Sequence, residues 1–194
     1  MGDIDKPVLE DLKNIVELCV SGNVRAQETL YRLLAPKMFG VCLRYSKDST
    51  EAEDNLQEGF IKVFTYLKNF RHEGSLEGWV RRIMVNVSVE KFRKQQLMHP
   101  VDDVRVFEGK NYQDDIIDKI SADELIQLIQ GLPPRYRMVF NLYVMEGMNH
   151  KEIGETMNIT EGTSKSNLAR ARDILKARVT ELYGESPVTR NFSA

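Results

Sequence analysis

The side chains best suited to bind a ligand by charge are concentrated near the C-terminal end of the chain. Between Thr160 and Arg178 there are five lysines and arginines against two acids, and small polar residues precede the first of these cations. Long cationic side chains reach phosphate oxygens and guanine, while small polar residues let a helix approach base edges. The segment therefore indicates contact with nucleic acid, and the alternative left open by the residues is a solvated, charged helix face.

Two short helical patterns separated by a tight polar turn surround these cations. Asn149 and Glu152 predict a capping box at the start of the first helix, and Asn158 tolerates the left-handed backbone needed where the chain turns. Thr160 predicts the N-cap of the second helix. The layout is typical of a helix-turn-helix, whose second helix lies in the DNA major groove. We expect DNA contacts from the outward residues of this helix, Lys165, Ser166, Asn167, Arg170 and Arg172, and from Thr163 and Ser164 at its entry.

A second basic segment, residues 79–94, has the sequence WVRRIMVNVSVEKFRK. Its apolar residues recur at helical spacing, which leaves a set of polar and cationic residues to point elsewhere. Phe70 and Trp79 lie nearby, and aromatic rings stack on unpaired bases, although rings at helical spacing more often belong to the core. The loop from Phe70 to Gly78 is the better candidate for holding a flipped base, because irregular backbone exposes both amides and side chains.

Composition excludes several other classes of function. The 194 residues are 42% apolar and 29% charged, which is ordinary for a soluble protein, and the longest uncharged apolar stretch, residues 138–145, is too short to cross a bilayer. The N-terminus is acidic and unlike a signal peptide, so we expect a cytoplasmic protein without membrane insertion. The two cysteines and three histidines have no metal-ligand spacing, and neither a nucleophile motif nor a phosphate-binding glycine loop occurs. We therefore expect no metal, no cofactor and no enzymatic activity.

Charge and periodicity divide the chain into segments. Residues 71–100 hold six cations and three acids, whereas residues 101–134 hold three cations and eight acids, although the net charge is only −2. Helical periodicity without alternation predicts an all-α protein of two small helical domains. We expect an N-terminal helical domain, an acidic linker, a C-terminal domain containing the helix-turn-helix and a flexible tail, with the bounds 1–98, 99–120, 121–183 and 184–194.

Two details of the N-terminal domain are also predicted. Pro36 should kink or divide the second helix, because proline lacks the backbone N–H that an interior position needs. Thr50 and Glu53 should form a capping box for the third helix.

Three blocks of the sequence resemble the extracytoplasmic-function sigma factors of bacterial RNA polymerase, in the order and spacing of that family. The blocks are residues 51–70, 79–94 and 132–172. The resemblance implies a factor that binds core RNA polymerase and promoter DNA, is restrained by an anti-sigma factor, and passes its acidic linker toward the active-site cleft and RNA exit path of the polymerase. A solvated linker is also often acidic, so its charge alone does not identify this role.

The resemblance assigns residues to three surfaces. The core polymerase contacts are Asp54, Gln57, Glu58 and Lys62. The contacts with the melted minus-ten element are Phe70, Arg71, His72, Trp79, Arg82, Asn86, Lys91 and Arg93. The contacts with the duplex minus-thirty-five element are the residues of the second helix of the helix-turn-helix given above.

Some positions depart from the family pattern. Gly59 stands beside the Gln57–Glu58 pair where apolar residues are usual, and Gly154 replaces a usual alanine. Because glycine inside a helix costs up to about 1 kcal/mol, these positions predict either looser helices or unusually close packing. Ser164 replaces a common valine and Asn167 a frequent arginine in the DNA-reading helix.

Two other interpretations are compatible with parts of the sequence. A stand-alone transcriptional regulator with a ligand-sensing N-terminal domain would bind duplex DNA tightly by itself, as a dimer on two half-sites. A helical hydrolase or metalloenzyme would need the metal or nucleophile motifs that the sequence lacks. A sigma factor, by contrast, should bind promoter DNA strongly only with core polymerase.

Overall fold

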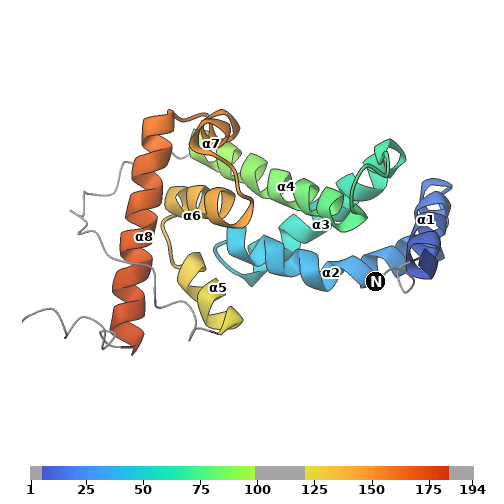
Figure 1. Ribbon diagram of the computed structural model, residues 1–194, viewed down its shortest axis with the longest axis horizontal. Coiled ribbons are helices and arrows are strands. Elements are labelled where there is room, and N and C mark those ends of the chain that lie inside the picture. Colours follow the sequence, from blue (N-terminus) through green and yellow to red (C-terminus); the bar gives the residue numbers. More distant parts are fainter. Residues whose placement is uncertain (1–5, 99–120, 184–194) are drawn as a thin grey trace, which may run out of the picture. The chain divides into compact units, whose positions relative to one another are not determined.

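The structure is a computed structural model that describes the backbone of residues 6–98 and 121–183 and the side chains of residues 12–96 and 121–183 (Figure 1). Every regular element in these ranges is helical, which confirms the all-α prediction. The chain divides into two compact units, residues 1–90 and 91–194, called here the N-terminal and C-terminal units. The predicted linker (99–120) and tail (184–194) lie outside the described residues.

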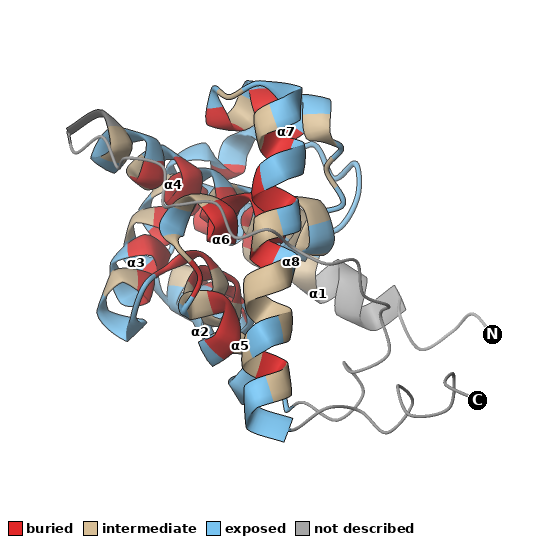
Figure 2. Cartoon of the chain, turned by 90° about the vertical axis from the view of Figure 1, so that its left-hand side faces the viewer, coloured by how far each residue is buried: buried red, intermediate tan, exposed pale blue. Residues whose placement is uncertain are grey.

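The N-terminal unit is built on a long central helix. Its elements are α1 (Lys6–Val20), α2 (Val24–Tyr45), α3 (Ser49–Tyr66), the short 3-10 helix η1 (Leu67–Asn69) and α4 (Leu76–Met98), whose last turns belong to the C-terminal unit. Helix α2 packs against both α1 and α3. The inward faces of these helices carry the buried residues, among them Leu30, Met38, Val63, Val80 and Met84 (Figure 2). None of the described helices is long and apolar enough to cross a membrane.

Of two local predictions in this unit, a division of α2 at Pro36 does not occur and the predicted cap of α3 is wrong. Helix α2 continues through Pro36 as one helix, because Leu34 and Met38 on either side are buried and the proline itself is exposed, where water can satisfy the carbonyl that lost its partner. The cap of α3 is Asp48 and not Thr50: the Asp48 carboxylate accepts a hydrogen bond from the Glu51 N–H at 2.9 Å. Glu51 in turn accepts from the backbone N–H of Lys47 at 2.7 Å.

Gly59 allows α3 and α4 to pack closely. Gly59 is buried, and a Cβ atom at this position would collide with the sulfur of Met84, a side chain on α4 that is itself fully buried. The glycine beside the Gln57–Glu58 pair therefore serves close packing between the two helices.

Replacing Gly59 by valine should destabilise the N-terminal unit. Overpacking against buried Met84 costs about 1 to 3 kcal/mol, more than the fraction of a kcal/mol that valine gains over glycine in helix propensity. Urea unfolding of the full chain followed by circular dichroism measures the loss. The additional change Met84→Ala makes room for the valine and should recover part of the stability. A Gly59→Val protein as stable as the wild type would contradict close packing at this site.

The C-terminal unit places three short helices against one long one. Its elements are α5 (Ala122–Gln130), α6 (Pro134–Phe140), the π-helical segment η3 (Asn141–Met145), α7 (His150–Met157) and α8 (Glu161–Tyr183). Helices α5, α6 and α7 all pack against α8. The fully buried side chains include Ile129, Val139, Leu142, Ile153 and Ala171.

The predicted helix-turn-helix is present as α7, a tight turn and α8. The Asn149–Glu152 capping box is confirmed, as is the left-handed conformation of Asn158, with φ 55° and ψ 50°. The Thr160 hydroxyl accepts a hydrogen bond from the N–H of Thr163 at 3.0 Å, as expected of the N-cap of α8. A Cβ at Gly154 would lie 2.8 Å from the carbonyl oxygen of Ile159, so this glycine lets the turn approach α7 closely.

Candidate nucleic-acid interface

The outward face of α8 carries some of the predicted DNA contacts but not all of them. Lys165, Ser166 and Arg172 are exposed, and Thr163 and Arg170 are half-buried. Lys165 is paired with Glu161 of the preceding turn at 2.7 Å, and the hydrogen bond and positive charge of Lys165 lower the pKa of the Glu161 carboxyl. These five side chains can therefore be reached from solvent, and one cation is partly neutralised by an acid of its own helix.

Asn167 faces inward, so the prediction that it lies on the outward face is wrong, and Ser164, predicted as a DNA contact at the helix entry, is buried as well. The exposed fractions of Ser164 and Asn167 are 0% and 1%. Together with Leu168 and Ala171 they occupy one stripe at helical spacing, which is the stripe that packs against the rest of the unit. The Ser164 hydroxyl lies 3.0 Å from Nδ1 of His150, which joins α8 to the start of α7.

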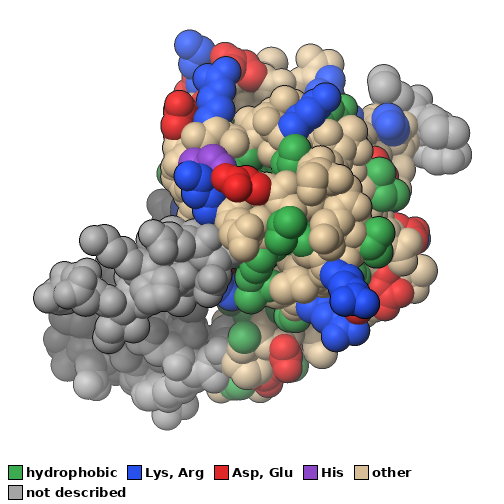
Figure 3. Space-filling view, turned by 90° about the vertical axis from the view of Figure 1, so that its right-hand side faces the viewer, with side chains coloured by type: hydrophobic (Ala, Val, Ile, Leu, Met, Phe, Trp, Pro, Cys, Tyr) green, Lys and Arg blue, Asp and Glu red, His purple; other side chains and the backbone are tan. Residues whose placement is uncertain are grey.

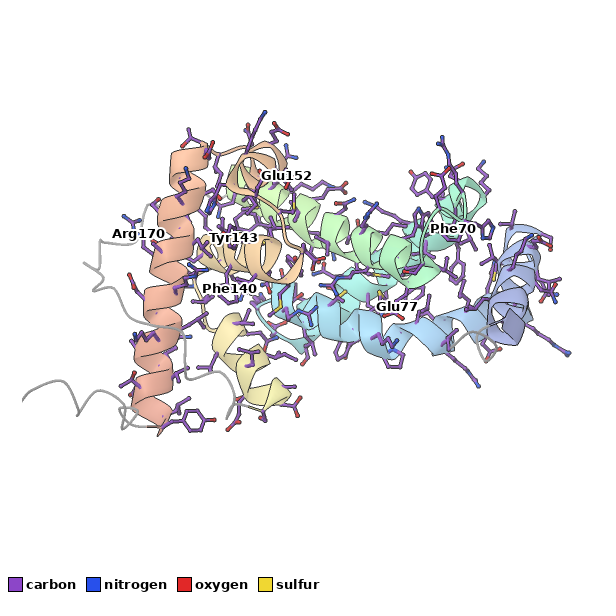
Figure 4. The ribbon with its side chains drawn as sticks, in the orientation of Figure 1. Phe70, Glu77, Phe140, Tyr143, Glu152 and Arg170 are labelled. Carbon is purple, nitrogen blue, oxygen red and sulfur yellow. The ribbon has the colours of Figure 1, made fainter. Side chains whose placement is uncertain are left out.

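Two tyrosines hold two of the arginines of α8. Arg170 Nη1 donates to the hydroxyl of Tyr136 on α6 at 3.2 Å. The guanidinium carbon of Arg172 lies 5.8 Å from the ring centroid of Tyr143 in η3, within cation–π distance. The side chains of Arg170 on α8 and Tyr143 in η3 are labelled in Figure 4. The sequence predicts no function for either tyrosine, because a tyrosine within a helical apolar pattern is indistinguishable from a core residue.

An aromatic cluster lies at the loop before α4. The Phe70 ring centroid is 4.7 Å from that of His72 and 5.6 Å from that of Trp79. His72 is exposed, whereas Phe70 and Trp79 are half-buried. The loop turns sharply because His72 and Gly74 both have positive φ, 57° and 108°. The predicted loop residues Phe70 and His72 are thus brought together with Trp79 of α4, and Arg71 beside them is exposed.

Polar residues of α4 form a stripe beyond this cluster. Arg82, Asn86 and Arg93 are exposed, and their spacing of four and seven residues places them on one side of the helix. Lys91 is half-buried, and its position in the sequence places it roughly on the opposite side of α4. The helix thus groups three of its four predicted minus-ten contacts and separates Lys91 from them.

The predicted polymerase contacts occupy one face of α3. Asp54 and Gln57 are exposed and Glu58 is half-buried, at the spacing that aligns residues along a helix. Lys62 differs from them, because its amino group lies 2.6 Å from Glu90 on α4 and 3.8 Å from Glu58. The hydrogen bond to Glu90 raises the pKa of Lys62. Lys62 therefore joins α3 to α4 within the protein.

Other kinds of site find little support among the described residues. Cys19 and Cys42 are buried, and burial raises the pKa of the Cys19 thiol. No group of three or more histidine, cysteine or acidic side chains in the described ranges could hold a metal ion. On the face drawn in Figure 3, hydrophobic side chains lie between separate basic and acidic side chains, and no large area carries charges of one sign only.

Comparison with known proteins decides between the interpretations. Residues 30–97 match the family described as Sigma-70 region 2, and residues 122–175 match Sigma-70, region 4. The RNA polymerase sigma-H factor of Pseudomonas aeruginosa is 30% identical over 190 residues, which cover 91% of this chain and 98% of the relative. The ECF RNA polymerase sigma factor SigW of Bacillus subtilis is 27% identical over 88% of this chain and 98% of the relative. The chain belongs to the extracytoplasmic-function sigma factors.

As a member of this family the protein is a subunit that directs promoter-specific initiation by bacterial RNA polymerase. The resemblance given by the three sequence blocks is confirmed, and the two matched regions fall in the helical segments that the sequence predicts. Among solved structures, the sigma factor RpoE of Bartonella quintana in complex with the anti-sigma factor NepR aligns with 82% of this chain and 99% of that chain, at 19% identity and a TM-score of 0.47.

Proposed function

We propose that the two helical parts of this sigma factor hold the promoter in two different physical states. The helix-turn-helix part, residues 121–183, binds the duplex minus-thirty-five element, and the helical part formed by residues 1–98 holds unpaired bases of the minus-ten element. The observation that carries this proposal is the presence of two chemically different surfaces: a cationic helix face on α8, and an aromatic cluster followed by a polar stripe on α4.

The aromatic cluster suits bases that have left the duplex. Extruding a base costs a few kcal/mol, and stacking on an aromatic ring returns about 1 to 3 kcal/mol per base. Phe70 supplies a ring that contacts the rings of both His72 and Trp79 at an accessible loop. Arg82, Asn86 and Arg93 then continue along α4 as contacts for the backbone of the separated strand.

Docking on core polymerase is assigned to the acidic face of α3. Asp54, Gln57 and Glu58 present carboxylates and an amide at helical spacing, and the exposed apolar Ile61 extends the same face. Lys62 is left out of this surface because its charge is engaged by Glu90. The role of the surface is non-catalytic, and the protein acts in the cytoplasm, where the polymerase works. An anti-sigma factor that covers the DNA-binding faces completes the proposal.

The aromatic cluster provides the test of the proposal. In a holoenzyme reconstituted from core polymerase, Phe70→Ala should reduce open-complex formation on a duplex promoter by about 5- to 100-fold, the equivalent of one lost base–ring stack. On a template with a preformed bubble at the minus-ten element the loss should be much smaller, because melting has already occurred. Permanganate reactivity of unpaired thymines and run-off transcription measure both effects. Equal activity of wild type and variant on the duplex promoter would contradict the assignment.

A further inference from the structure

We propose that Arg170 and Arg172 contact the backbones of opposite DNA strands, and that Tyr136 and Tyr143 act as positioning residues for these two arginines. The inference rests on the proposed function, in which α8 enters the major groove. It goes further, because it separates the residues of α8 that contact bases from the two arginines that contact phosphates. It also assigns a role to two tyrosines that do not themselves touch DNA.

Helical geometry places the two arginines on opposite flanks. Residues two positions apart leave an α-helix about 200° apart, which is close to opposite directions. The exposed residues Ser166 and Ala169 fall between the arginines around the helix, and the buried stripe of Ser164, Leu168 and Ala171 lies on the other side. Lys165 projects about 20° from Arg172 but two turns nearer the N-terminus of α8, the end of a recognition helix that contacts base edges. The exposed surface of α8 therefore has two small side chains at its centre, an arginine on each side and a lysine near its N-terminal end.

This arrangement matches the walls of a major groove. A helix that enters the groove turns its outermost face to the base edges, and its flanks face the two sugar–phosphate strands. Contacts with phosphates fix the register and orientation of the helix, and contacts with base edges carry the sequence information. Arg170 and Arg172 are therefore assigned to phosphates, and Lys165 and Ser166 to bases.

Tyr136 restricts the motion of Arg170. The tyrosine is only 5% exposed, so its ring is fixed by packing, and its hydroxyl accepts a hydrogen bond from Arg170 Nη1 at 3.2 Å. A guanidinium carries five N–H donors in a planar fork, so the same arginine can donate to the phenol and to a phosphate. Because an ordered arginine loses less conformational entropy when it meets a phosphate, this contact favours binding without touching DNA.

Tyr143 restricts Arg172 through a stack that joins three elements. The Tyr143 ring lies 5.8 Å from the Arg172 guanidinium carbon and is stacked on the His150 ring, with centroids 4.8 Å apart and planes 25° apart. His150 is held in turn by the buried hydroxyl of Ser164 at 3.0 Å. The inward position of Ser164 thus fits this role, because it fixes the histidine against which the tyrosine rests.

The test uses the full chain in holoenzyme, with a duplex library randomised at the minus-thirty-five element and a series of salt concentrations. Arg170→Ala and Arg172→Ala should each weaken binding to all sequences about evenly and lower the slope of log affinity against log salt by about 1. Lys165→Ala should instead change which sequences are bound best. Arginine variants that alter the preferred sequence at unchanged salt slope would overturn the assignment to phosphates.

The positioning role has its own readout. Tyr136→Phe removes only the hydroxyl, and we expect about a two- to fivefold loss of affinity that disappears in the Arg170→Ala background, with the urea unfolding curve unchanged. Tyr143→Phe keeps the ring and should bind like the wild type, whereas Tyr143→Leu should lose affinity as Arg172→Ala does. A Tyr136→Phe loss of equal size in both backgrounds, or no loss in either, would remove the positioning role.

The outcomes also separate this inference from the proposed function. If Lys165→Ala changes the preferred sequence but the arginine and tyrosine variants bind like the wild type, α8 reads DNA and only the inference about the arginines and tyrosines fails. If Lys165→Ala, Arg170→Ala and Arg172→Ala all bind the library like the wild type, the assignment of α8 to the minus-thirty-five element fails as well.

Discussion

Reversing two charges on α3, Asp54→Lys together with Glu58→Lys, should weaken assembly with core RNA polymerase by about 10- to 100-fold. Asp54 is exposed and Glu58 is half-buried one turn further along the same face. Neither reversal opens a cavity, and the ion pair of Glu58 with Lys62, at 3.8 Å, is a weak one. The expected loss is therefore one of binding, because lysines would oppose the cationic surface that an acidic helix face selects.

Competition against a labelled sigma factor for core polymerase measures this effect. Glu17→Lys, which reverses an exposed acid on α1 away from the docking face, is the matched control and should assemble normally. Lys62→Ala is a second control: it breaks the 2.6 Å pair with Glu90 and should lower stability slightly while leaving docking intact. Undiminished assembly of the doubly reversed protein would remove α3 from the docking surface.

Short-range rules predicted the ends of the helices well. The predicted capping box of Asn149 with Glu152 is present, and Asn158 adopts the left-handed conformation at the end of α7. These features depend on residues three or four apart, so the sequence contains all the information they need. Where two caps compete within the same few residues, as with Asp48 and Thr50, local rules alone did not choose between them.

Predictions that depended on tertiary contacts were less successful. The polar character of Ser164 and Asn167 favours contact with DNA, but the phase of α8 is set by Leu168 and Ala171, which are buried against the rest of the unit together with them. Pro36 did not divide α2, because burial on both sides of it holds the helix together. In both cases packing outweighed the preference of the individual residue.

The residues that organise the site were the hardest to find from sequence. Tyr136 and Tyr143 have the spacing of core residues, and only their contacts with Arg170 and Arg172 distinguish them. Gly59 differs in this respect, because a glycine inside a helix already predicts either weakness or close packing. The structure supplied the missing partner, Met84, and thereby favoured close packing.

A single buried arginine should contribute more to the stability of the C-terminal unit than any exposed residue of its DNA-binding face. Arg137 on α6 is 4% exposed, and its Nη1 donates to the carbonyl of Gln130, the last residue of α5, at 2.7 Å. The end of a helix carries unsatisfied carbonyls and a partial negative charge, so a cation there is favourable. Arg178 of α8 donates to the carbonyl of Leu128 in the same turn, more weakly, at 3.4 Å.

Arg137→Ala should lower the free energy of unfolding by about 2 to 4 kcal/mol, since it leaves both a cavity and an unpaired carbonyl, while relief from burying a charge offsets part of the loss. Arg137→Met keeps the volume and should lose about 1 to 2 kcal/mol, and Arg178→Ala about 0.5 to 1 kcal/mol. Urea unfolding of the full chain gives this order. If Arg137→Met were as stable as the wild type, the guanidinium would contribute volume alone, and the anchoring of α5 would rest on apolar contacts.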